Sequence, residues 1–446
     1  MSVRVWRLSF SGALVASVTS VIIGCQSGDS GSGGQRQSLP ATSATDVAAV
    51  TPDDAAAVAA LEMAGCSLRR DAAGHVSELS VSVEDGTDFV PVLKNLAGLH
   101  SLTVARLGGP GLSDAALQPI SGLTTLRRLD LTDASGIGDE TLKAAGALTN
   151  LESLILRRAG FTDDGLQHIQ QLPKLRALDV RNSNVTDAGV ARLAGMKSLV
   201  DLQLEKSKVT DACADTLATL PLKSLNLNYT AITDAAMPAI AKIQTLEQLQ
   251  LEAARLTDLG MAEVGKLKRL RRFGCRLADI TGEGVKQLAG CTELTRLELR
   301  ETSVDDDGLA AICGLPKLTF LDISECKLVT GEGIAKLAAL TNLTYLELRE
   351  IKKVRDESFA PLAALSKLTE LNLEATRISS ESLPVLLKFK QLQRLHLAGT
   401  QLDDVGMQQL TQLSSLKYLD LSNCEPSTET VEKLRAAIPG LELKVN

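Results

Sequence analysis

Aromatic residues are scarce in this chain of 446 residues, at 2% of the total. Trp6 is the single tryptophan, and the rest of the aromatic content is seven Phe and three Tyr. The apolar fraction is nevertheless 44%, and leucine dominates it. A core of nearly uniform aliphatic side chains suits a regular array in which each layer repeats the one before it.

Histidine is also scarce, and its four residues are His75, His100, His168 and His396. The sequence contains no G-x-S-x-G element, no phosphate-binding loop and no zinc-ligand spacing. The acidic run 305–307 lacks the loop glycine and distal Glu of a calcium-binding hand. These absences argue against an enzyme and against a metal or other cofactor. A weak hydrolase built on a serine and His396 stays open.

An excess of basic charge is missing as well. The formal net charge is −7, and residues 25–446 alone carry −9, because Arg4 and Arg7 lie in the first 24 residues. A nucleic-acid-binding chain usually presents a basic face, so we expect no nucleic-acid partner. Mixed charge of this kind is typical of a soluble surface.

Residues 1–24 have the pattern of a lipoprotein signal peptide. Arg4 and Arg7 form a basic region, and Leu8 to Ile23 is an apolar run shorter than the ~20 residues of a membrane span. The run ends in Ile-Ile-Gly-Cys25, which resembles a bacterial lipobox. The resemblance implies that Cys25 receives lipid and becomes the mature N-terminus. The alternative is a chance cysteine behind an ordinary signal peptide.

Residues 25–48 are predicted to be a lipid-anchored linker. The segment Gln26–Pro40 is rich in Gly and Ser and cannot bury enough apolar surface to fold. We therefore expect an exported chain that is anchored to the bacterial cell envelope, with its folded part in the periplasm or at the cell surface. Gln26, rather than Asp, slightly favours the outer membrane by analogy with enteric bacteria.

A repeated L-x-x-L-x-L pattern occupies the chain from Val76 onward. Most intervals are 24 residues, and a period of 20–29 residues with this core is the signature of leucine-rich repeats. The alternation of the last two aliphatic residues predicts a short strand. The units begin at Val76, Leu99, Leu126, Leu151, Leu175, Leu199, Leu222, Leu246, Leu270, Leu294, Leu318, Leu343, Leu368, Leu392 and Leu416, and a degenerate copy begins at Ile438.

The second half of each unit predicts a short helix. In the segment 185–190, Thr186 or Asp187 is suited to cap a helix N-terminus. A small residue recurs at the position of Gly189, which predicts close packing of helix against strand. We therefore predict an α/β leucine-rich-repeat solenoid (horseshoe) of about 15 repeats over residues 76–437, with a concave parallel β-sheet and short helices on the convex side.

Both ends of such a solenoid need covers. Residues 49–75 are predicted to form an N-terminal helical cap, with an amphipathic helix from Asp53 to Leu68. Glu429 to Ala437, followed by a cap strand in residues 438–446, is predicted to close the other end.

The element I-T-D-x-G-L, present as 185–190 and 256–261, resembles the repeats of planctomycete leucine-rich-repeat proteins that are secreted or lipid-anchored. The segment Leu61–Val76, with Gly65, Asp71 and Gly74, looks like the start of the same family. The chain is similar, more distantly, to the cysteine-containing repeats of eukaryotic F-box adaptors, although Thr, Ser or Ala mostly replaces that cysteine. The resemblance implies protein–protein interaction and carries over no catalytic residue.

Seven cysteines remain after Cys25, and none has a C-x-x-C spacing. Cys275 falls on a core strand position, and Cys326 and Cys424 fall on the turn after the strand. Small buried thiols are the favoured interpretation. A disulfide between neighbouring repeats is the alternative, because an exported chain meets an oxidising compartment.

Positions 3, 5, 7 and 8 of each unit are predicted to face out from the concave sheet. All three tyrosines fall on these positions, and aromatic and arginine side chains dominate binding hot spots. The candidate partner-binding residues are Arg296, Glu298, Arg300, Phe320, Asp322, Tyr345, Glu347, Arg349, Tyr229 and Tyr418.

Two interpretations of this face stay open. The acids at position 5 of three consecutive units repel one another across the strands, and arginines at position 7 are placed to neutralise them in an ion-pair lattice. Alternatively, the same residues form a patch for a polar partner. The leading prediction is thus a non-catalytic protein–protein interaction module, tethered to the envelope, that binds an unidentified protein or peptide. The alternative is a structural envelope scaffold that self-associates or binds cell-wall glycan.

Overall fold

The computed structural model describes residues 51–445. The predicted signal peptide, Cys25 and the predicted linker lie outside the described residues. Residues 50–446 form one compact unit. Among the described residues, no helix combines the length and the apolar character needed to cross a membrane.

One sheet of 17 strands runs through residues 51–445, and each strand pairs with the next along the chain. The pairing of β1 with β2 is antiparallel, and every later pairing is parallel. The strands are β1 (Ser67–Arg70), β2 (Val76–Ser82), β3 (Val104–Gly108), β4 (Arg128–Asp130), β5 (Ser153–Ile155), β6 (Ala177–Asp179), β7 (Asp201–Gln203), β8 (Ser224–Asn226), β9 (Gln248–Gln250), β10 (Arg272–Gly274), β11 (Arg296–Glu298), β12 (Phe320–Asp322), β13 (Tyr345–Glu347), β14 (Glu370–Asn372), β15 (Arg394–His396), β16 (Tyr418–Asp420) and β17 (Glu442–Lys444).

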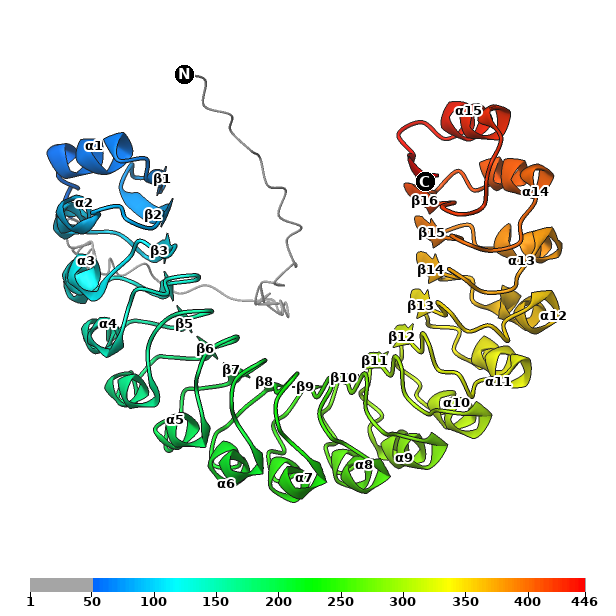
Figure 1. Cartoon of the computed structure of the whole chain (residues 1–446), viewed down its shortest axis with the longest axis horizontal. Coiled ribbons are helices and arrows are strands. Elements are labelled where there is room, and N and C mark those ends of the chain that lie inside the picture. The colour runs from blue at the N-terminus through cyan, green and yellow to red at the C-terminus, as the bar shows by residue number, and fades with distance from the viewer. Residues whose placement is uncertain (1–50, 446) are drawn as a thin grey trace, which may run out of the picture. The chain divides into compact units, whose positions relative to one another are not determined.

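Short helices form the outer side of the curve, and the strands form the inner, concave side (Figure 1). The α-helices are α1 (Ala55–Met63), α2 (Val90–Leu93), α3 (Asp114–Leu117), α4 (Asp139–Ala145), α5 (Asp187–Ala191), α6 (Ala214–Leu217), α7 (Met237–Ile240), α8 (Asp258–Val264), α9 (Gly282–Lys286), α10 (Asp306–Ile312), α11 (Gly331–Lys336), α12 (Asp356–Phe359), α13 (Leu383–Leu386), α14 (Asp404–Gln409) and α15 (Thr428–Ala437). The 3-10 helices are η1 (Lys94–Gly98), η2 (Gln118–Gly122), η3 (Asp163–His168), η4 (Asp211–Cys213), η5 (Asp234–Ala236), η6 (Gln287–Gly290), η7 (Leu337–Ala339), η8 (Ala360–Ala364), η9 (Ser380–Ser382) and η10 (Leu410–Gln412).

The repeated aliphatic residues fill the space between sheet and helices. In one unit Leu175, Leu178 and Val180 are at most 1% exposed, and equivalent residues continue in a single core from Val58 to Ile438. Because each layer buries its apolar face only against its neighbours, the core is as long as the array.

Two units begin at other residues than the pattern predicts. Val104 pairs with Glu78 on one side and Arg128 on the other, so the second unit begins at Leu102 rather than Leu99. Glu442 pairs with Tyr418, which moves the last unit from 438 to 440. In the second unit Leu102 offers an alternative start, and in the last unit Leu443 and Val445 fit positions 4 and 6 of a unit that begins at Gly440. The aliphatic pattern alone therefore does not fix the register.

The N-terminal cover is a helix followed by a hairpin. The predicted helix from Asp53 to Leu68 is too long, because α1 ends at Met63 and Gly65 adopts φ 84°. Leu68 instead lies in β1, which covers the free edge of β2. At the other end, α15 and β17 form the predicted cover.

Hydrogen bonds between repeats join the helix N-termini in a ladder. The Thr186 side chain caps α5, and the next residue, Asp187, accepts hydrogen bonds from the N–H and hydroxyl of Thr210 at 2.8 and 2.7 Å. The same pair of bonds joins Asp139 to Thr162, Asp163 to Thr186, Asp211 to Thr233, Asp234 to Thr257, Asp258 to Thr281, Asp306 to Thr330, Asp356 to Ser379 and Asp404 to Ser427.

The ladder also explains the small residue at the position of Gly189. A Cβ on Gly189 would lie 2.2 Å from a carboxylate oxygen of Asp163, which belongs to the preceding repeat. The prediction that this position serves helix-to-strand packing is therefore wrong, because the neighbouring ladder aspartate occupies the space.

Between Thr281 and Ser427, three repeats lack the ladder aspartate, and the repeat that follows each of them changes its cap. Gly282 precedes Asp305, Gly331 precedes Arg355, and Ser380 precedes Asp403. Asp305 and Asp403 accept from their own helices instead, at the N–H of Gly308 and Gly406. From Thr281 onward, repeats that receive an aspartate alternate with repeats that supply one.

The loops at the two edges of the sheet differ in charge. The amino-edge loops run from each helix to the next strand, and the carboxyl-edge loops run from each strand to the next helix. The amino-edge loops contain three acids, Glu152, Glu247 and Glu293. They contain sixteen basic residues, namely Arg127, Lys174, Arg176, Arg192, Lys197, Lys223, Lys242, Lys266, Lys268, Arg269, Arg271, Lys317, Lys367, Lys388, Lys390 and Lys417. The carboxyl-edge loops contain fourteen of each sign.

Candidate functional site on the concave face

The central candidate residues lie on the adjacent strands β11, β12 and β13. Arg296, Phe320 and Tyr345 are register partners at position 3. Glu298, Asp322 and Glu347 are register partners at position 5 of the same strands. Since alternate residues of a strand point to the same side, the two rows share the concave face. We call these six residues the concave patch.

Three side chains of the concave patch are stacked. The rings of Phe320 and Tyr345 are 3.9 Å apart and nearly parallel, at 10°. The guanidinium of Arg296 lies 3.5 Å from the Phe320 ring centre, on the side of β11. Such stacking holds three side chains in fixed orientations, so they form a preorganised surface.

Glu347 lies beside the stack, two residues after Tyr345 on β13, and is partly buried. The Tyr345 hydroxyl donates to its Oε2 at 2.9 Å, while its Oε1 is buried and has no hydrogen-bond partner among the described residues. Burial raises the pKa of Glu347, and the neighbouring Asp322 adds to that rise. This carboxylate is therefore costly to ionise in the unbound protein.

The arginines at position 7 do not neutralise this row of acids. Arg300 pairs with Glu325 at 2.7 Å, and Arg349 pairs with the same Glu325 and with Glu350 at 3.2 Å. Arg296 pairs with Glu298. Within the described residues, Asp322 and Glu347 have no ion-pair partner.

An earlier part of the same face shows the lattice that the sequence predicted. Asp179 accepts from Arg157 at 2.7 Å and from Arg181 at 2.8 Å. Burial alone would raise the pKa of Asp179, but the hydrogen bonds and charges of the two arginines outweigh it and lower the pKa. The ion-pair lattice therefore exists around Asp179, and it is absent around Asp322 and Glu347.

Tyr229 and Tyr418 lie apart from the concave patch. Tyr418 is in the same column three strands away, where Arg394 lies 4.2 Å from its ring centre and His396 packs beside it. Tyr229 is in the turn after β8, and its hydroxyl donates to Glu252 at 2.9 Å. The structure thus brings eight of the ten candidate residues together, if Arg300 and Arg349 are counted with the patch.

Sequence reasoning missed Glu325 and the acids beside it. Glu301, Glu325 and Glu350 follow the strand in three consecutive repeats, at position 8. All three adopt left-handed backbone angles near φ 60°. The column of three glutamates at position 8 was visible in the sequence. Only the geometry shows that Glu325 and Glu350, rather than the acids at position 5, pair with Arg300 and Arg349.

The cysteines of the described residues are free thiols, and five of the seven are buried. Cys326, for example, contacts the carbonyl oxygen of Leu299 at 3.2 Å. Residues 51–445 contain no group of three or more His, Cys, Asp or Glu placed to hold a metal ion.

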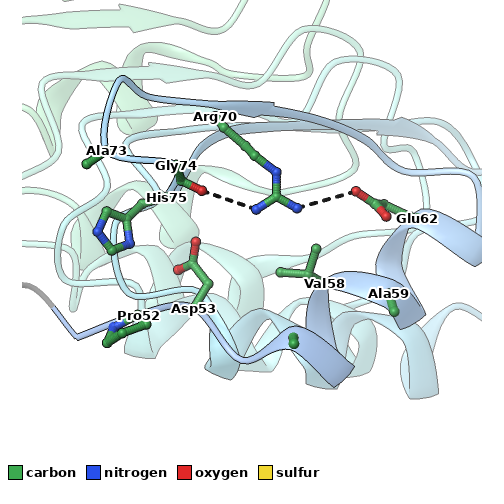
Figure 2. Close-up of a pocket in the computed structure, with 10 residues that line it drawn as sticks. Pro52, Asp53, Val58, Ala59, Glu62, Arg70, Ala73, Gly74 and His75 are labelled. Carbon is green, nitrogen blue, oxygen red and sulfur yellow. Dashed lines mark hydrogen bonds and ion pairs between the residues drawn. The ribbon is translucent and has the colours of Figure 1, made fainter.

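A separate hollow of about 410 Å³ lies at the N-terminal cover, between α1 and the hairpin (Figure 2). The polar groups that line it bond to one another. Arg70 donates to the carbonyl oxygen of Gly74 at 3.1 Å and forms an ion pair with Glu62 at 3.7 Å. Asp53 accepts from the backbone N–H of Val76 and of His100. Asp53 therefore connects the N-terminal cover to the first repeats.

Comparison with protein families finds the leucine-rich-repeat model. It matches residues 122–144, 171–194, 290–313 and 314–338, which together make up less than half of the chain. The last two segments contain β11 and β12, which carry four of the six residues of the concave patch. No curated protein sequence matches the chain.

Solved structures of other repeat proteins have the same architecture. An internalin of Listeria monocytogenes is 23% identical, with a TM-score of 0.50 over 84% of this chain and 96% of that chain. A leucine-rich-repeat protein of Leptospira interrogans is 22% identical, with a TM-score of 0.54 over 78% of this chain and 91% of that one. Together with the family match, they confirm the predicted fold: this chain is a leucine-rich-repeat solenoid.

Proposed function

We propose that this chain is a non-catalytic interaction module that binds a protein or peptide on its concave face, at β11 to β13. Solenoid repeat proteins use their extended concave surfaces for binding. The observation that carries the proposal is the preorganised stack of Arg296, Phe320 and Tyr345 beside two carboxylates, Asp322 and Glu347, that lack ion-pair partners in the described residues.

The position of Phe320 supports this reading. Of the six phenylalanines in residues 51–445, Phe320 is the one that is not buried. A chain this poor in aromatic residues places two of them side by side on an open polar face. Aromatic and arginine side chains of this kind supply most of the energy in protein interfaces.

The charge of the concave patch indicates the chemistry of the partner. Asp322 and Glu347 offer acceptor oxygens without a cation, and Oε1 of Glu347 lacks any donor in the described residues. A Lys or Arg side chain of the partner would supply the missing positive charge. The partner segment is therefore expected to carry a basic residue beside an apolar one.

Affinity capture from solubilised envelope, with residues 50–446 as bait, identifies the partner. Its binding is then measured for the wild type and for Phe320→Ala/Tyr345→Ala. The proposal expects at least a tenfold weaker affinity for the double variant, since anchor truncation in an interface costs about 2 kcal/mol or more. Glu347→Gln is expected to weaken binding as well.

The matched control is Leu259→Ala/Val405→Ala, which removes two exposed apolar side chains outside the concave face. This variant should bind like the wild type, and circular dichroism should show both variants folded. Equal affinity for all three proteins would contradict a concave binding site.

We also propose that lipid on Cys25 tethers the module to the envelope, outer membrane favoured. The sequence pattern at 22–25 supports this, as does the predicted kinship with planctomycete repeat proteins, which stays a prediction. Metabolic labelling with a clickable palmitate should mark the wild-type chain and leave Cys25→Ser unlabelled. Labelling of both would refute the assignment.

A further inference from the structure

The amino-edge loops concentrate positive charge on a protein whose net charge is negative. Their sixteen basic residues face three acids, whereas the whole chain carries −7. All sixteen are exposed. Eleven of them form no ion pair within the described residues. The net charge of the whole chain does not reveal this basic edge, because the acids that outweigh its positive charge lie on the helices.

The charge is spread along the edge and is locally dense. Lys268, Arg269 and Arg271 lie in one loop. Lys174, Arg176 and Lys197 line a hollow of about 460 Å³ between adjacent loops, with Glu152 at its rim. Consecutive strands are ~4.8 Å apart, so the loops present cations in a row along the amino edge of the sheet.

We propose that the amino edge lies against a membrane surface rich in anionic phospholipid headgroups. A lipid surface is a laterally extended array of negative charge that attracts each Lys or Arg near it. A row of exposed, unpaired cations along one side of a curved solenoid matches that array in sign and in extent. This contact is independent of the concave patch and leaves that face open.

Two other anionic partners fit less well. Edge-to-edge pairing with a second copy of the chain is disfavoured, because the carboxyl-edge loops carry equal numbers of basic and acidic residues. A nucleic-acid strand is usually held by aromatic side chains that stack on bases. The amino-edge loops contain one aromatic residue, Phe389, and it is buried.

The test uses residues 50–446, because this compact unit contains the whole described core and both end covers. Co-sedimentation is measured with vesicles of phosphatidylcholine alone and of phosphatidylcholine with 40% phosphatidylglycerol, at ~50 and ~300 mM NaCl. The wild type should bind the anionic vesicles at least tenfold more tightly than the neutral ones at low salt, and should be released at high salt.

The edge variant is Arg176→Gln/Lys197→Gln/Arg269→Gln/Arg271→Gln, and none of these four side chains forms an ion pair or hydrogen bond in the described residues. The matched control, Lys208→Gln/Arg255→Gln/Lys327→Gln/Lys352→Gln, removes the same charge from exposed carboxyl-edge positions. The edge variant should lose at least tenfold in affinity for anionic vesicles, and the control should stay within twofold of the wild type.

Three outcomes overturn the proposal. They are equal binding to neutral and anionic vesicles, an equal loss in both variants, and binding to duplex DNA or heparin without binding to vesicles. The Phe320→Ala/Tyr345→Ala variant should bind vesicles like the wild type, so failure of the concave site and failure of the edge are separate results.

Discussion

At the scale of single residues, the turn after each strand requires a left-handed backbone. Asn182, Ala253 and Glu350, one per repeat, have φ of 55°, 56° and 60°. An L-residue with a Cβ is disfavoured there by roughly 1–2 kcal/mol, and most repeats accept that strain. Gly399 occupies the same turn with φ 64°, and a Cβ there would make only an ordinary van der Waals contact, at 3.9 Å from the Cα of Ala375.

Gly399→Ala is therefore expected to lower the free energy of unfolding by about 1 kcal/mol, through backbone strain alone. Urea denaturation followed by circular dichroism measures the change. Gly122→Ala is the control, because no atom lies within 4 Å of its Cβ position and its φ is not left-handed. A midpoint for Gly399→Ala that equals or exceeds that of Gly122→Ala would show that the turn is not strained.

Glu347 gives a prediction with a defined pH dependence. Its pKa in the folded protein lies above the ordinary 4.5, so ionisation costs more in the folded state than in the unfolded chain. Wild-type stability relative to Glu347→Gln therefore falls as the pH rises from about 4.5 through the folded pKa.

At pH 7 the Glu347→Gln variant should be the more stable protein, by on the order of 1 kcal/mol, since an unpaired buried charge has been removed. Thermal unfolding at pH 4 and pH 7 measures the difference, which should nearly vanish at pH 4. Asp179→Asn is the opposite case: its pKa is lowered, so that variant should be the less stable one at pH 7.

At the scale of elements, helix N-termini depend on the repeat before them. The sequence predicted Thr186 and Asp187 as alternative caps of one helix. The structure divides the roles, with Thr186 capping its own helix and Asp187 bonding to Thr210. A periodic sequence shows which positions recur, but it does not show which neighbour a side chain reaches.

Gly282→Asp should be destabilising by about 2 kcal/mol or more, because its Cβ would lie 2.1 Å from a carboxylate oxygen of Asp305 and two negative charges would meet. The double variant Gly282→Asp/Asp305→Thr recreates the pairing of Asp187 with Thr210. It should recover most of the loss.

A double-mutant cycle on chemical denaturation measures the coupling, which is expected to be at least about 1.5 kcal/mol. Additive effects of the two substitutions would mean that the ladder positions do not interact.

At the scale of the molecule, the aliphatic period predicted most of the architecture. Parallel strands and outer helices follow from Leu, Ile and Val at fixed spacing. The register of the second and last units did not follow, because Leu99 and Leu102 offer equivalent starts. In the candidate site, the sequence predicted which residues share a face. It did not predict that Arg300 and Arg349 turn to Glu325, since several acids lie within reach of each arginine.

Removal of residues 426–446 tests the C-terminal cover. The deletion takes away α15 and β17. It leaves the edge of β16 unpaired and removes Leu434 and Ile438 from the end of the core. Exposed strand edges template association between chains. Size-exclusion chromatography with light scattering should show oligomers or aggregates for residues 50–425, against a monomer or a defined oligomer for residues 50–446.

The alternation of caps from Thr281 onward has a consequence for how such an array is lengthened. Between Thr162 and Thr257 every repeat both receives and supplies an aspartate, so one repeat more or fewer leaves all junctions intact. Beyond Thr281, removing a single repeat would either leave a Thr or Ser without its aspartate or, with the Ser379 repeat gone, set Asp356 against Asp403. That part of the chain has a parity: it keeps its junctions only when repeats are inserted or lost in twos.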